Sequence, residues 1–327
     1  MTQIGYHASH EQFSPSELLS LVTQAEAKGF DFAIASDHFY PWNDAQGQSG
    51  FVWAWLGAAL SRTSFPMGVV NCPCHRYHPV IIAQAVATLL EMFPNRFWLA
   101  AGSGQLLNEG VIGAHWPSKA RRNEKLAEAV QVMRSLWRGE EVNHQGHFDV
   151  QEAKLYTMPK STPHLLAAAI TSSTAGWAAD WADELITISQ PLDQLTKVVE
   201  AWKQGHGKNK PMMIKWQVSY DRDEEQAKLG AHEQWRTNVF GSDLSSQLRT
   251  PLQFEMAAAH VTPDEMSEYV FISNDPEKYL DTINTFRKMG FEKIDIHNVN
   301  KNQEGFIDFV GREILPRLKG TKGTAPH

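Results

Sequence analysis

Hydrophobic and polar positions along the chain follow a repeating order, in which a short apolar run precedes a longer stretch with helical periodicity. The apolar runs are rich in β-branched and aromatic residues and are bounded by turn-forming residues, as is typical of buried parallel strands. Eight runs fit this description, at residues 4–9, 32–36, 67–72, 97–102, 164–171, 184–189, 212–220 and 293–299. The pattern predicts eight strands separated by helices.

Helix boundary signals support this order. Residues 14–17 read Ser-Pro-Ser-Glu, a capping-box pattern that predicts a helix start, and Gly29 marks its end. Pro79 predicts the first turn of another helix, and a further helix is predicted from Asp275 to about Gly290. Eight strand–helix units are typical of an α/β fold of the TIM (β/α)8 barrel class, here with insertions.

Two stretches interrupt the repeat. Residues 139–163 indicate a hairpin before the fifth strand, and residues 236–270 form a long excursion between the seventh and eighth strands. Insertions of this length often cover a site. We predict a single domain over residues 1–319, with a flexible tail at 320–327.

Composition narrows the classes of function. Hydrophobic residues make up 42% of the chain and charged residues 20%, which is enough for a full core. A net charge of −7 without a basic run argues against a nucleic-acid surface. No apolar stretch approaches the roughly 20 residues of a membrane helix, and the first residues lack signal-peptide character. We therefore expect a cytoplasmic protein with a small-molecule substrate, no nucleic-acid partner and no membrane association.

The predicted strand ends carry the candidate chemistry, because barrels of this class place their active sites at the carboxyl ends of strands. Asp37, His38 and Trp42 follow the second strand. Similar polar sequences follow the others: Glu11 and Gln12 after the first, 71–78 after the third, 102–109 after the fourth and 171–174 after the fifth. We expect these residues to converge at one mouth.

Several of these residues allow a second interpretation. The Gly102-Ser103-Gly104 turn lacks the third glycine of a dinucleotide fingerprint, so a close backbone approach to a flat ring is as plausible as phosphate binding. Thr171 at a helix start favours either phosphate binding or ordinary N-capping. His38 is alternatively a structural histidine. Cys72 and Cys74, one residue apart, are expected to be free thiols, and their spacing is too tight for a usual zinc site.

The order of these motifs resembles one known family. The relevant sequences are Ala8 to Phe13, Ser36 to Phe39 with Pro41-Trp42, Arg76-Tyr77, Ile82 to Gln84, Pro94 to Arg96, Gly102 to Gly104 and Leu107 to Glu109. Together they resemble the bacterial luciferase-like superfamily, and within it the F420-dependent glucose-6-phosphate dehydrogenase group. The resemblance spans nearly the whole chain. It implies a flavin or deazaflavin ring in the barrel mouth, with a bulged, often cis peptide around Val70-Asn71 supporting the ring.

The chain departs from this group at the positions that handle protons and phosphates. The family's carboxylic acid beside the reduced deazaflavin falls on Gln105, and an amide cannot deliver a proton at pH 7. The two-glycine turn after the fifth strand is Ile170-Thr171. The three cations that grip the sugar phosphate fall on Gln190 or Pro191, Ser245 and Tyr269, with Arg249 as a partial replacement. These changes favour FMN over F420 and argue against glucose 6-phosphate.

The resulting hypothesis is an FMN-dependent oxidoreductase in which His38 shuttles a proton during hydride transfer. The predicted catalytic residues are His38, Trp42, Gln105 and Glu11. The predicted cofactor contacts are Asp37, Val70, Asn71, Cys72, Ser103, Gly104, Asn108, Ala169, Ile170 and Thr171, with no metal ligands. The alternatives are an F420-dependent alcohol or sugar dehydrogenase, a monooxygenase using reduced FMN, a non-catalytic flavin-binding protein and a metal-dependent hydrolase using Cys72 to His78. The family resemblance further implies a homodimer.

Overall fold

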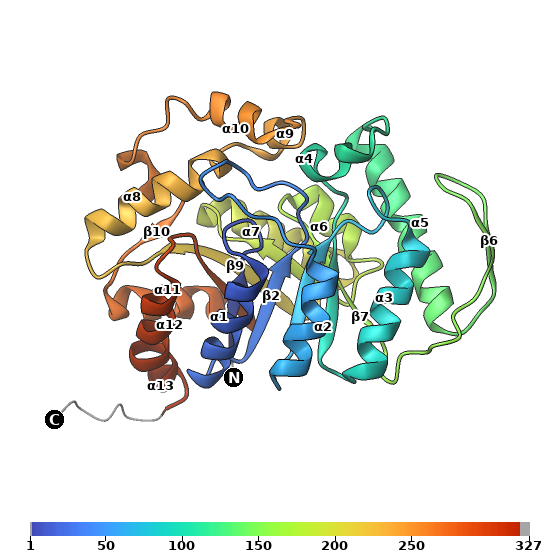
Figure 1. The fold of residues 1–327 in the computed structure, drawn as a ribbon, viewed down its shortest axis with the longest axis horizontal. Coiled ribbons are helices and arrows are strands. Elements are labelled where there is room, and N and C mark those ends of the chain that lie inside the picture. Colours follow the sequence, from blue (N-terminus) through green and yellow to red (C-terminus); the bar gives the residue numbers. More distant parts are fainter. Residues whose placement is uncertain (1, 321–327) are drawn as a thin grey trace.

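The computed structural model describes residues 2–320, and eight of its strands close into a parallel barrel. The strands follow one another around the ring in the order β1-β2-β3-β4-β7-β8-β9-β11, and β11 pairs back with β1 (Figure 1). Their bounds are β1 Gln3–Ala8, β2 Phe32–Ser36, β3 Met67–Asn71, β4 Phe97–Ala101, β7 His164–Ala168, β8 Glu184–Ile188, β9 Met212–Ser219 and β11 Lys293–Asn298. The predicted TIM barrel is therefore confirmed.

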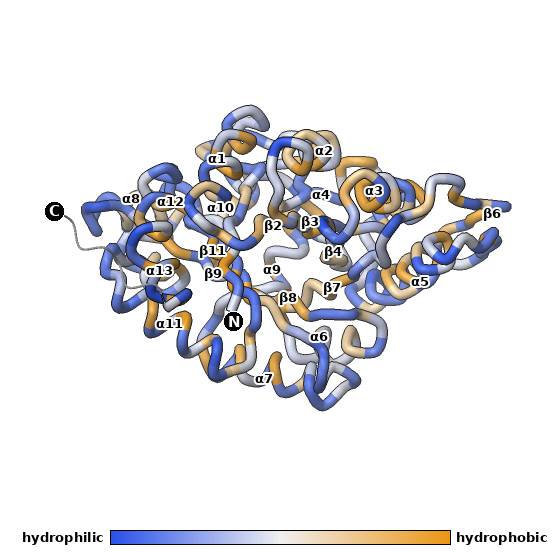
Figure 2. Tube along the Cα trace, turned by 90° about the horizontal axis from the view of Figure 1, so that it is seen from below, coloured by the Kyte–Doolittle hydropathy of each residue, from blue (hydrophilic) through white to orange (hydrophobic). Residues whose placement is uncertain are grey.

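Helices surround the strands, as the view from below in Figure 2 shows. The main helices of this outer layer are α1 Pro15–Ala27, α2 Val52–Arg62, α3 Pro79–Met92, α5 Lys119–Trp137, α6 Ser172–Ala178, α7 Leu192–Trp202, α8 Glu224–Trp235, α11 Pro276–Met289, α12 Gln303–Phe309 and α13 Leu315–Leu318. Short helical turns lie at 110–112, 203–207, 236–238, 264–268 and 310–314. The buried faces of the helices and the outward residues of the strands form the larger core.

The predicted helix boundaries follow from local hydrogen bonding. Ser14 caps α1 by accepting from the backbone N–H of Glu17 at 3.4 Å. Asp275 caps α11 in the same way, and Gly290 ends that helix with a φ of 102°. A positive φ is the conformation that glycine adopts without strain, which explains the glycine at this position.

The predicted strands agree with the observed ones within a residue or two at most ends, with two exceptions. β7 stops at Ala168 instead of residue 171, because Thr171 already caps the following helix α6. A short ninth strand, β10 (Phe271–Ile272), adds to the carboxyl end of β9 and was not predicted. The predicted hairpin is confirmed as the antiparallel pair β5 (Val142–His144) and β6 (Val150–Ala153), which projects from one side in Figure 1.

The excursion at 236–270 lies over the carboxyl end of the barrel. It contains α9 (Ser242–Ser245) and α10 (Pro251–Ala257), which lie at the same end as α4 (Leu106–Glu109) in Figure 1, while α9 shows through the centre of the ring in Figure 2. Trp116 donates to the carbonyl of Ser246 at 3.1 Å, and Arg249 donates to the carbonyl of Gly110 at 3.1 Å. The excursion is thus fixed to the loops that follow β4.

The barrel interior has an apolar half and a polar half. β2, β4, β7, β8 and β9 contribute a small apolar cluster, made of Phe32, Ile34, Trp98, Ala100, Leu166, Ile186 and Met213. β1, β9 and β11 instead place His7, Lys215, Asp295 and His297 together, with His7 Nδ1 2.8 Å from Asp295 Oδ2. Charged groups inside an otherwise apolar barrel are costly, so their presence indicates a function.

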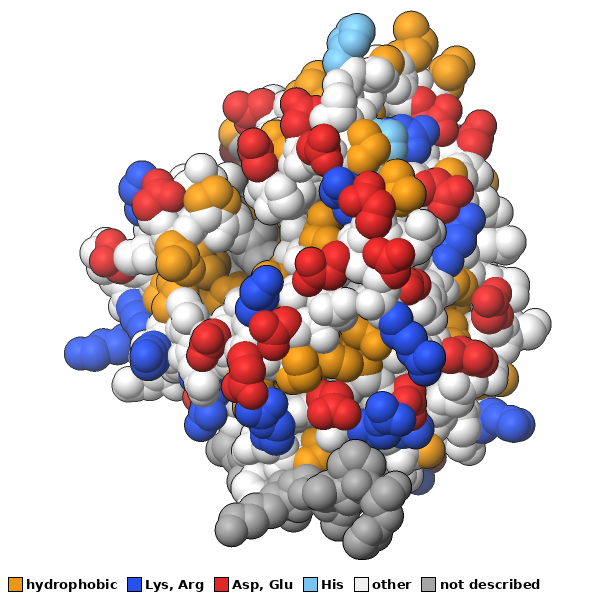
Figure 3. All heavy atoms as spheres, turned by 90° about the vertical axis from the view of Figure 1, so that its left-hand side faces the viewer, with side chains coloured by type: hydrophobic (Ala, Val, Ile, Leu, Met, Phe, Trp, Pro, Cys, Tyr) orange, Lys and Arg blue, Asp and Glu red, His pale blue; other side chains and the backbone are white. Residues whose placement is uncertain are grey.

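The predicted tail at 320–327 lies outside the described residues except for Gly320. Within residues 2–320, none of the helices has the length and apolar character that crossing a bilayer requires. Figure 3 shows acidic and basic side chains interspersed on the face to the left of Figure 1. That face presents no large area of one sign.

Candidate active site

Glu11 and His38 form a buried pair at the carboxyl ends of β1 and β2. Oε1 of Glu11 lies 3.3 Å from Nδ1 of His38, and Oε2 accepts hydrogen bonds from Ser36 at 2.7 Å and Ser9 at 3.1 Å. Both carboxylate oxygens are therefore occupied. With Nδ1 directed at Glu11 and at the carbonyl of Tyr40, Nε2 is left as the ring's free acceptor within the described chain.

The electrostatics of this pair suit a base that is neutral near pH 7. Burial alone would raise the pKa of Glu11, but His38 and Lys215 lower it to about 2. Burial lowers the pKa of His38 below 6.5, and Lys215 adds to this effect, while Glu11 opposes it. An ionised carboxylate thus orients a neutral imidazole, which is the arrangement that general base catalysis requires.

Trp42 connects the pair to the covering excursion. Its ring centroid lies 5.1 Å from that of His38 and 5.2 Å from that of Phe254 on α10. Trp42, Leu107 and Phe254 form a separate apolar cluster against which Phe240 and Leu248 pack. His38 is consequently walled by an aromatic surface on the side of the excursion.

Asp37 is held by three neighbouring side chains. Its carboxylate receives Asn71 Nδ2 at 2.6 Å, Arg76 Nη2 at 2.9 Å and Tyr77 OH at 3.2 Å. Asn71 keeps its Oδ1 buried and without a hydrogen-bond partner among the described residues. Asp37, predicted as a cofactor contact, is engaged by protein atoms, whereas Asn71 offers an unused acceptor to a ligand.

The loop after β4 brings together most of the remaining predicted residues. Ser103 accepts from Lys119 Nζ at 2.6 Å, and Gly104 has a φ of 80°. Gln105 precedes α4 without capping it, so its amide makes no hydrogen bond in the described structure. Asn108 accepts from the backbone N–H groups of Phe39 and Tyr40 at 2.9 and 3.3 Å, and so positions the loop that carries His38.

Gly104 packs directly on two further residues of the site. A Cβ at this position would lie 2.8 Å from Cγ of Glu109 and 2.9 Å from Sγ of Cys72. Burial raises the pKa of Glu109 to about 7, although the hydrogen bond from the backbone of Arg76 lowers it. The turn therefore requires glycine and brings the backbone close to the mouth.

The residues after β7 and β3 complete the predicted set. Thr171 caps α6 by accepting from the backbone N–H of Thr174 at 3.4 Å, which is the N-capping interpretation. Ala169 is buried and Ile170 is 40% exposed. Val70 and Asn71 pair regularly with Ala100 and Ala101.

The expected cis peptide and bulge near Val70 and Asn71 are wrong for this structure, because residues 2–320 contain no cis peptide bond. The regular ladder extends to Gly102, whose N–H donates to the carbonyl of Asn71 at 2.9 Å. A backbone that pairs fully with its neighbour has no room for the extra residue of a bulge.

Cys72, Cys74 and His75 lie together, with their ligand atoms within 4.8 Å of one another. Both cysteines are free. Burial raises the pKa of Cys72 well above its usual range and lowers that of His75 to about 4, with Lys125 and Arg122 adding to the effect on His75. Burial favours the neutral thiol of Cys72, and a metal binds the thiolate, so this cluster is a weaker candidate than the Glu11–His38 pair.

Sequence reasoning missed the charged residues on the barrel floor below His38. Asp295 and Lys215 are directly opposite each other on β11 and β9, and His7 and His297 stack with centroids 4.2 Å apart. The sequence did contain a signal for them. Lys215 and Asp295 are charged residues within apolar strands, at positions where the alternation of side chains along a strand directs them into the barrel.

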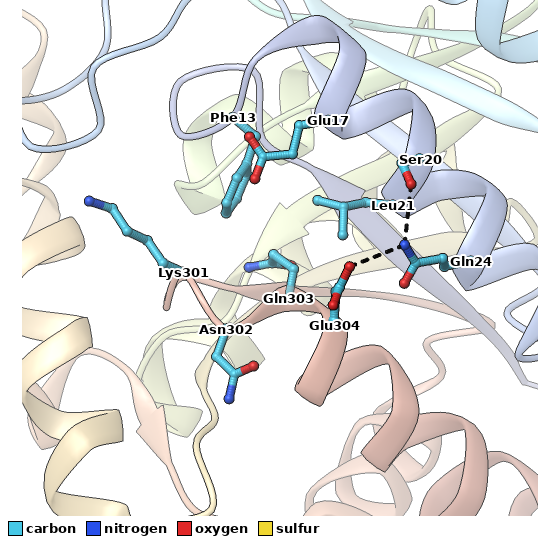
Figure 4. Close-up of a pocket in the computed structure, with 9 residues that line it drawn as sticks. All are labelled: Phe13, Glu17, Ser20, Leu21, Gln24, Lys301, Asn302, Gln303 and Glu304. Carbon is cyan, nitrogen blue, oxygen red and sulfur yellow. Dashed lines mark hydrogen bonds between the residues drawn. The ribbon is translucent and has the colours of Figure 1, made fainter.

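Two surface cavities lie away from this site. One, of about 290 Å³, lies between α1 and the segment leading into α12 (Figure 4). Gln24 donates to Glu304 across it at 3.5 Å, and its walls contain none of the predicted catalytic residues. The other is a shallow depression on α11 at Asn284, Arg287 and Lys288. Neither changes the position of the candidate site.

Comparison with known proteins decides the family. The family model described as luciferase-like monooxygenase matches residues 1–293. The chain belongs to the luciferase-like family. It is an oxidoreductase.

Individual relatives extend this similarity over the full length of the chain. An F420-dependent glucose-6-phosphate dehydrogenase of Beutenbergia cavernae is 32% identical over 330 residues, covering 98% of each chain. The solved structure of an F420-dependent secondary alcohol dehydrogenase with an F420-acetone adduct is 30% identical, with a TM-score of 0.89 and coverage of 98% of this chain and 99% of that one.

A more distant structure shares the fold alone. The oxygenating component of 3,6-diketocamphane monooxygenase from Pseudomonas putida, in complex with FMN, is 14% identical with a TM-score of 0.70, covering 99% of each chain. Flavin and deazaflavin enzymes therefore occur on the same barrel.

The residues at the mouth fit a flat ring with polar edges. Asn71 Oδ1 is an orphaned acceptor, the amide of Gln105 is free, and the turn at Gly104 brings backbone to the surface without a side chain. These groups could accept and donate hydrogen bonds at the polar edge of such a ring.

Proposed function

We propose that this chain catalyses hydride transfer between a small alcohol or carbonyl substrate and a bound F420-type deazaflavin. The observation that carries this proposal is the Glu11–His38 pair, in which a buried carboxylate contacts Nδ1 of an imidazole and leaves its Nε2 without a partner in the described chain. When bound, the cofactor supplies a two-electron acceptor for a hydride.

The chain's own residues handle the proton. Nε2 of His38 accepts the hydroxyl proton of the substrate, and Glu11 stabilises the imidazolium that forms. Ser36 keeps the carboxylate in place by donating to Oε2 at 2.7 Å. Trp42 and the excursion restrict access of water to this proton, because Trp42 packs against Phe254 of α10.

F420 is the first cofactor to test, because the full-length relatives named above use it. FMN remains the second candidate, and Gln105 is the observation in its favour. An amide there can donate a hydrogen bond to a negatively charged ring edge, but it cannot act as an acid. In this proposal, Asn71, Ser103 and Gly104 contact the ring in either case.

The same reasoning limits the substrate. Gln190 donates to the carbonyl of Ile170 at 3.3 Å, and Tyr269 is 45% exposed and uncharged. Arg249, the one cation of this region that the sequence offered, donates to the carbonyl of Gly110. A dianionic sugar phosphate would find little neutralisation there, so we propose a smaller substrate. We also propose that the chain forms a homodimer.

The test compares binding of F420, FMN and FAD to the purified apoprotein by calorimetry and by thermal shift, since a ligand that binds only the folded state raises its stability. Selective binding of F420, followed by its reduction by a panel of alcohols, supports the proposal, whereas selective binding of FMN would replace F420 by the second candidate. Failure of all three to bind would overturn it.

A further inference from the structure

Lys215 is a lysine inside the barrel that has no close ion pair. Burial lowers its pKa, and the nearby carboxyl groups of Glu11 and Asp295 oppose this. It lies on β9 opposite Asp295 of β11 and is only partly buried. Among residues 2–320, no carboxylate lies within 4.0 Å of its Nζ, and the group makes no hydrogen bond. Its closest recorded partner is the ring of Trp235, whose centroid is 5.5 Å from Nζ.

The carboxylates near Lys215 are held by other groups at every oxygen except Oδ1 of Asp295, which is buried without a partner among the described residues. Both oxygens of Glu11 are occupied by His38 and two serines, and Oδ2 of Asp295 contacts His7 at 2.8 Å. Burial also raises the pKa of Asp295 well above its usual range, although Lys215 opposes this, so this carboxyl is a weak counter-ion.

A second lysine in the same barrel shows the usual arrangement. Lys293, at the other end of β11, pairs with Oε2 of the buried Glu184 at 2.8 Å. Buried cations are normally paired in this way, because an unpaired charge loses its hydration without compensation. Lys215, half-buried on β9, has no such pair within 4.0 Å among the described residues.

The position of Nζ is set by its neighbours. Trp235 ends α8 and packs edge-on against His297 at 4.8 Å. Lys215 is also close enough to Glu11 and His38 to influence the pKa of each. The Lys215 side chain thus lies within electrostatic reach of both members of the Glu11–His38 pair.

We propose that Lys215 binds the carboxylate of a small hydroxy acid whose hydroxyl group contacts Nε2 of His38. This inference rests on the proposed function and narrows its substrate class. Oxidation breaks the substrate's C–H and O–H bonds: the hydride leaves to the bound cofactor, the proton passes to His38, and the carbinol carbon becomes a carbonyl. Reduction of an oxo acid is the reverse.

A monoanion fits this site better than a phosphate monoester. Lys215 supplies a single positive charge, whereas a phosphate near neutral pH carries close to two. The neighbouring titratable groups are the ionised carboxylate of Glu11, which would repel a second negative charge, Asp295, whose raised pKa favours its neutral form, and two histidines whose pKa values burial lowers well below 6.5. The single positive charge of Lys215 therefore matches the single negative charge of a substrate carboxylate.

The experiment measures binding of two acid and amide pairs to the cofactor-loaded protein by calorimetry: lactate with lactamide, and 3-hydroxybutyrate with its amide. The wild-type protein should prefer the acid of at least one pair by about 10- to 100-fold, the range expected for a hydrogen bond to a charged group. Lys215→Met should remove this preference, and Lys215→Arg should retain part of it. Lys197→Met, which removes an exposed lysine on α7, is the control for net charge.

Two outcomes would overturn the inference: equal affinity of the wild-type protein for acid and amide in both pairs, or a preference that survives in Lys215→Met. If Lys215→Met does not fold, the wild-type comparison still decides. Cofactor affinity is measured in the same samples. Normal cofactor binding without acid preference refutes the role of Lys215 alone, whereas absent cofactor binding refutes the proposed function.

Discussion

Replacement of Glu11 by glutamine tests the central pair most directly. The substitution keeps the size of the side chain and removes its charge 3.3 Å from Nδ1 of His38. The pKa of Glu11 falls from 4.5 to about 2, and a pKa unit corresponds to roughly 1.4 kcal/mol, so its surroundings favour the carboxylate by about 3 kcal/mol. His38 is the largest favourable contributor, and we assign it on the order of 1 kcal/mol.

The electrostatic interaction between Glu11 and His38 affects the pKa of both groups, so removing the charge of Glu11 also changes the pKa of His38. The pKa of His38 is already below 6.5, and Glu11 raises it against burial and Lys215. Glu11→Gln should therefore lower the pKa of His38 further. The acidic limb of kcat/KM should move to lower pH, and its plateau should fall by roughly 10²-fold because the imidazolium loses its counter-ion.

The assay is an NMR titration of the histidine ring, assigned by the resonance that disappears in His38→Ala. Glu200→Gln, an exposed change on α7, is the matched control and should leave the titration unchanged. An unchanged or higher pKa of His38 in Glu11→Gln would refute the reasoning. The free energy of unfolding should also depend on pH. The lowered pKa of Glu11 stabilises the fold above pH 4.5, and this contribution is lost as the pH falls toward 2. Over that range the wild-type protein should lose about 3 kcal/mol of unfolding free energy that Glu11→Gln does not lose.

Three further changes test separate parts of the site. His38→Ala should lower turnover by about 10²- to 10⁴-fold while cofactor affinity measured by calorimetry changes little, and equal loss of both would contradict the role of a base. Gln105→Glu should raise F420-linked turnover relative to FMN-linked turnover, and an unchanged ratio would show that an acid is not needed there. Phe254→Ala removes a fully buried ring that packs on Trp42, so it should cost about 3–5 kcal/mol in denaturant unfolding and expose residues 236–270 to proteolysis, which an intact excursion would resist.

The sequence was sufficient to locate the mouth. Parallel strands bring their carboxyl ends to one edge, so finding polar residues after five predicted strands already brought Glu11, His38 and Gln105 together. Helix starts such as Ser14 and Asp275 were equally predictable, because capping depends on residues three or fewer positions apart.

Which atoms are free at the mouth was not predictable. Asp37 and Asn108 are at the expected places, yet their oxygens bond Arg76, Tyr77 and backbone N–H groups from distant segments. Such pairings depend on the three-dimensional approach of loops and not on spacing along the chain. β10 was not predicted because two residues carry too little periodicity to identify a strand.

The apolar and polar halves of the barrel interior separate the residues proposed to select the cofactor from those proposed to select the substrate. The residues proposed to contact the cofactor ring follow β3, β4 and β7, above the apolar half. His38 follows β2 and Glu11 follows β1, while Lys215 lies on β9, on or beside the polar half. Substitutions at Gln105 and Ile170 can therefore change the cofactor without disturbing the charge of Lys215, and a change at Lys215 can alter the substrate without disturbing the ring. Relatives on this barrel with different cofactors are the expected result of such independence.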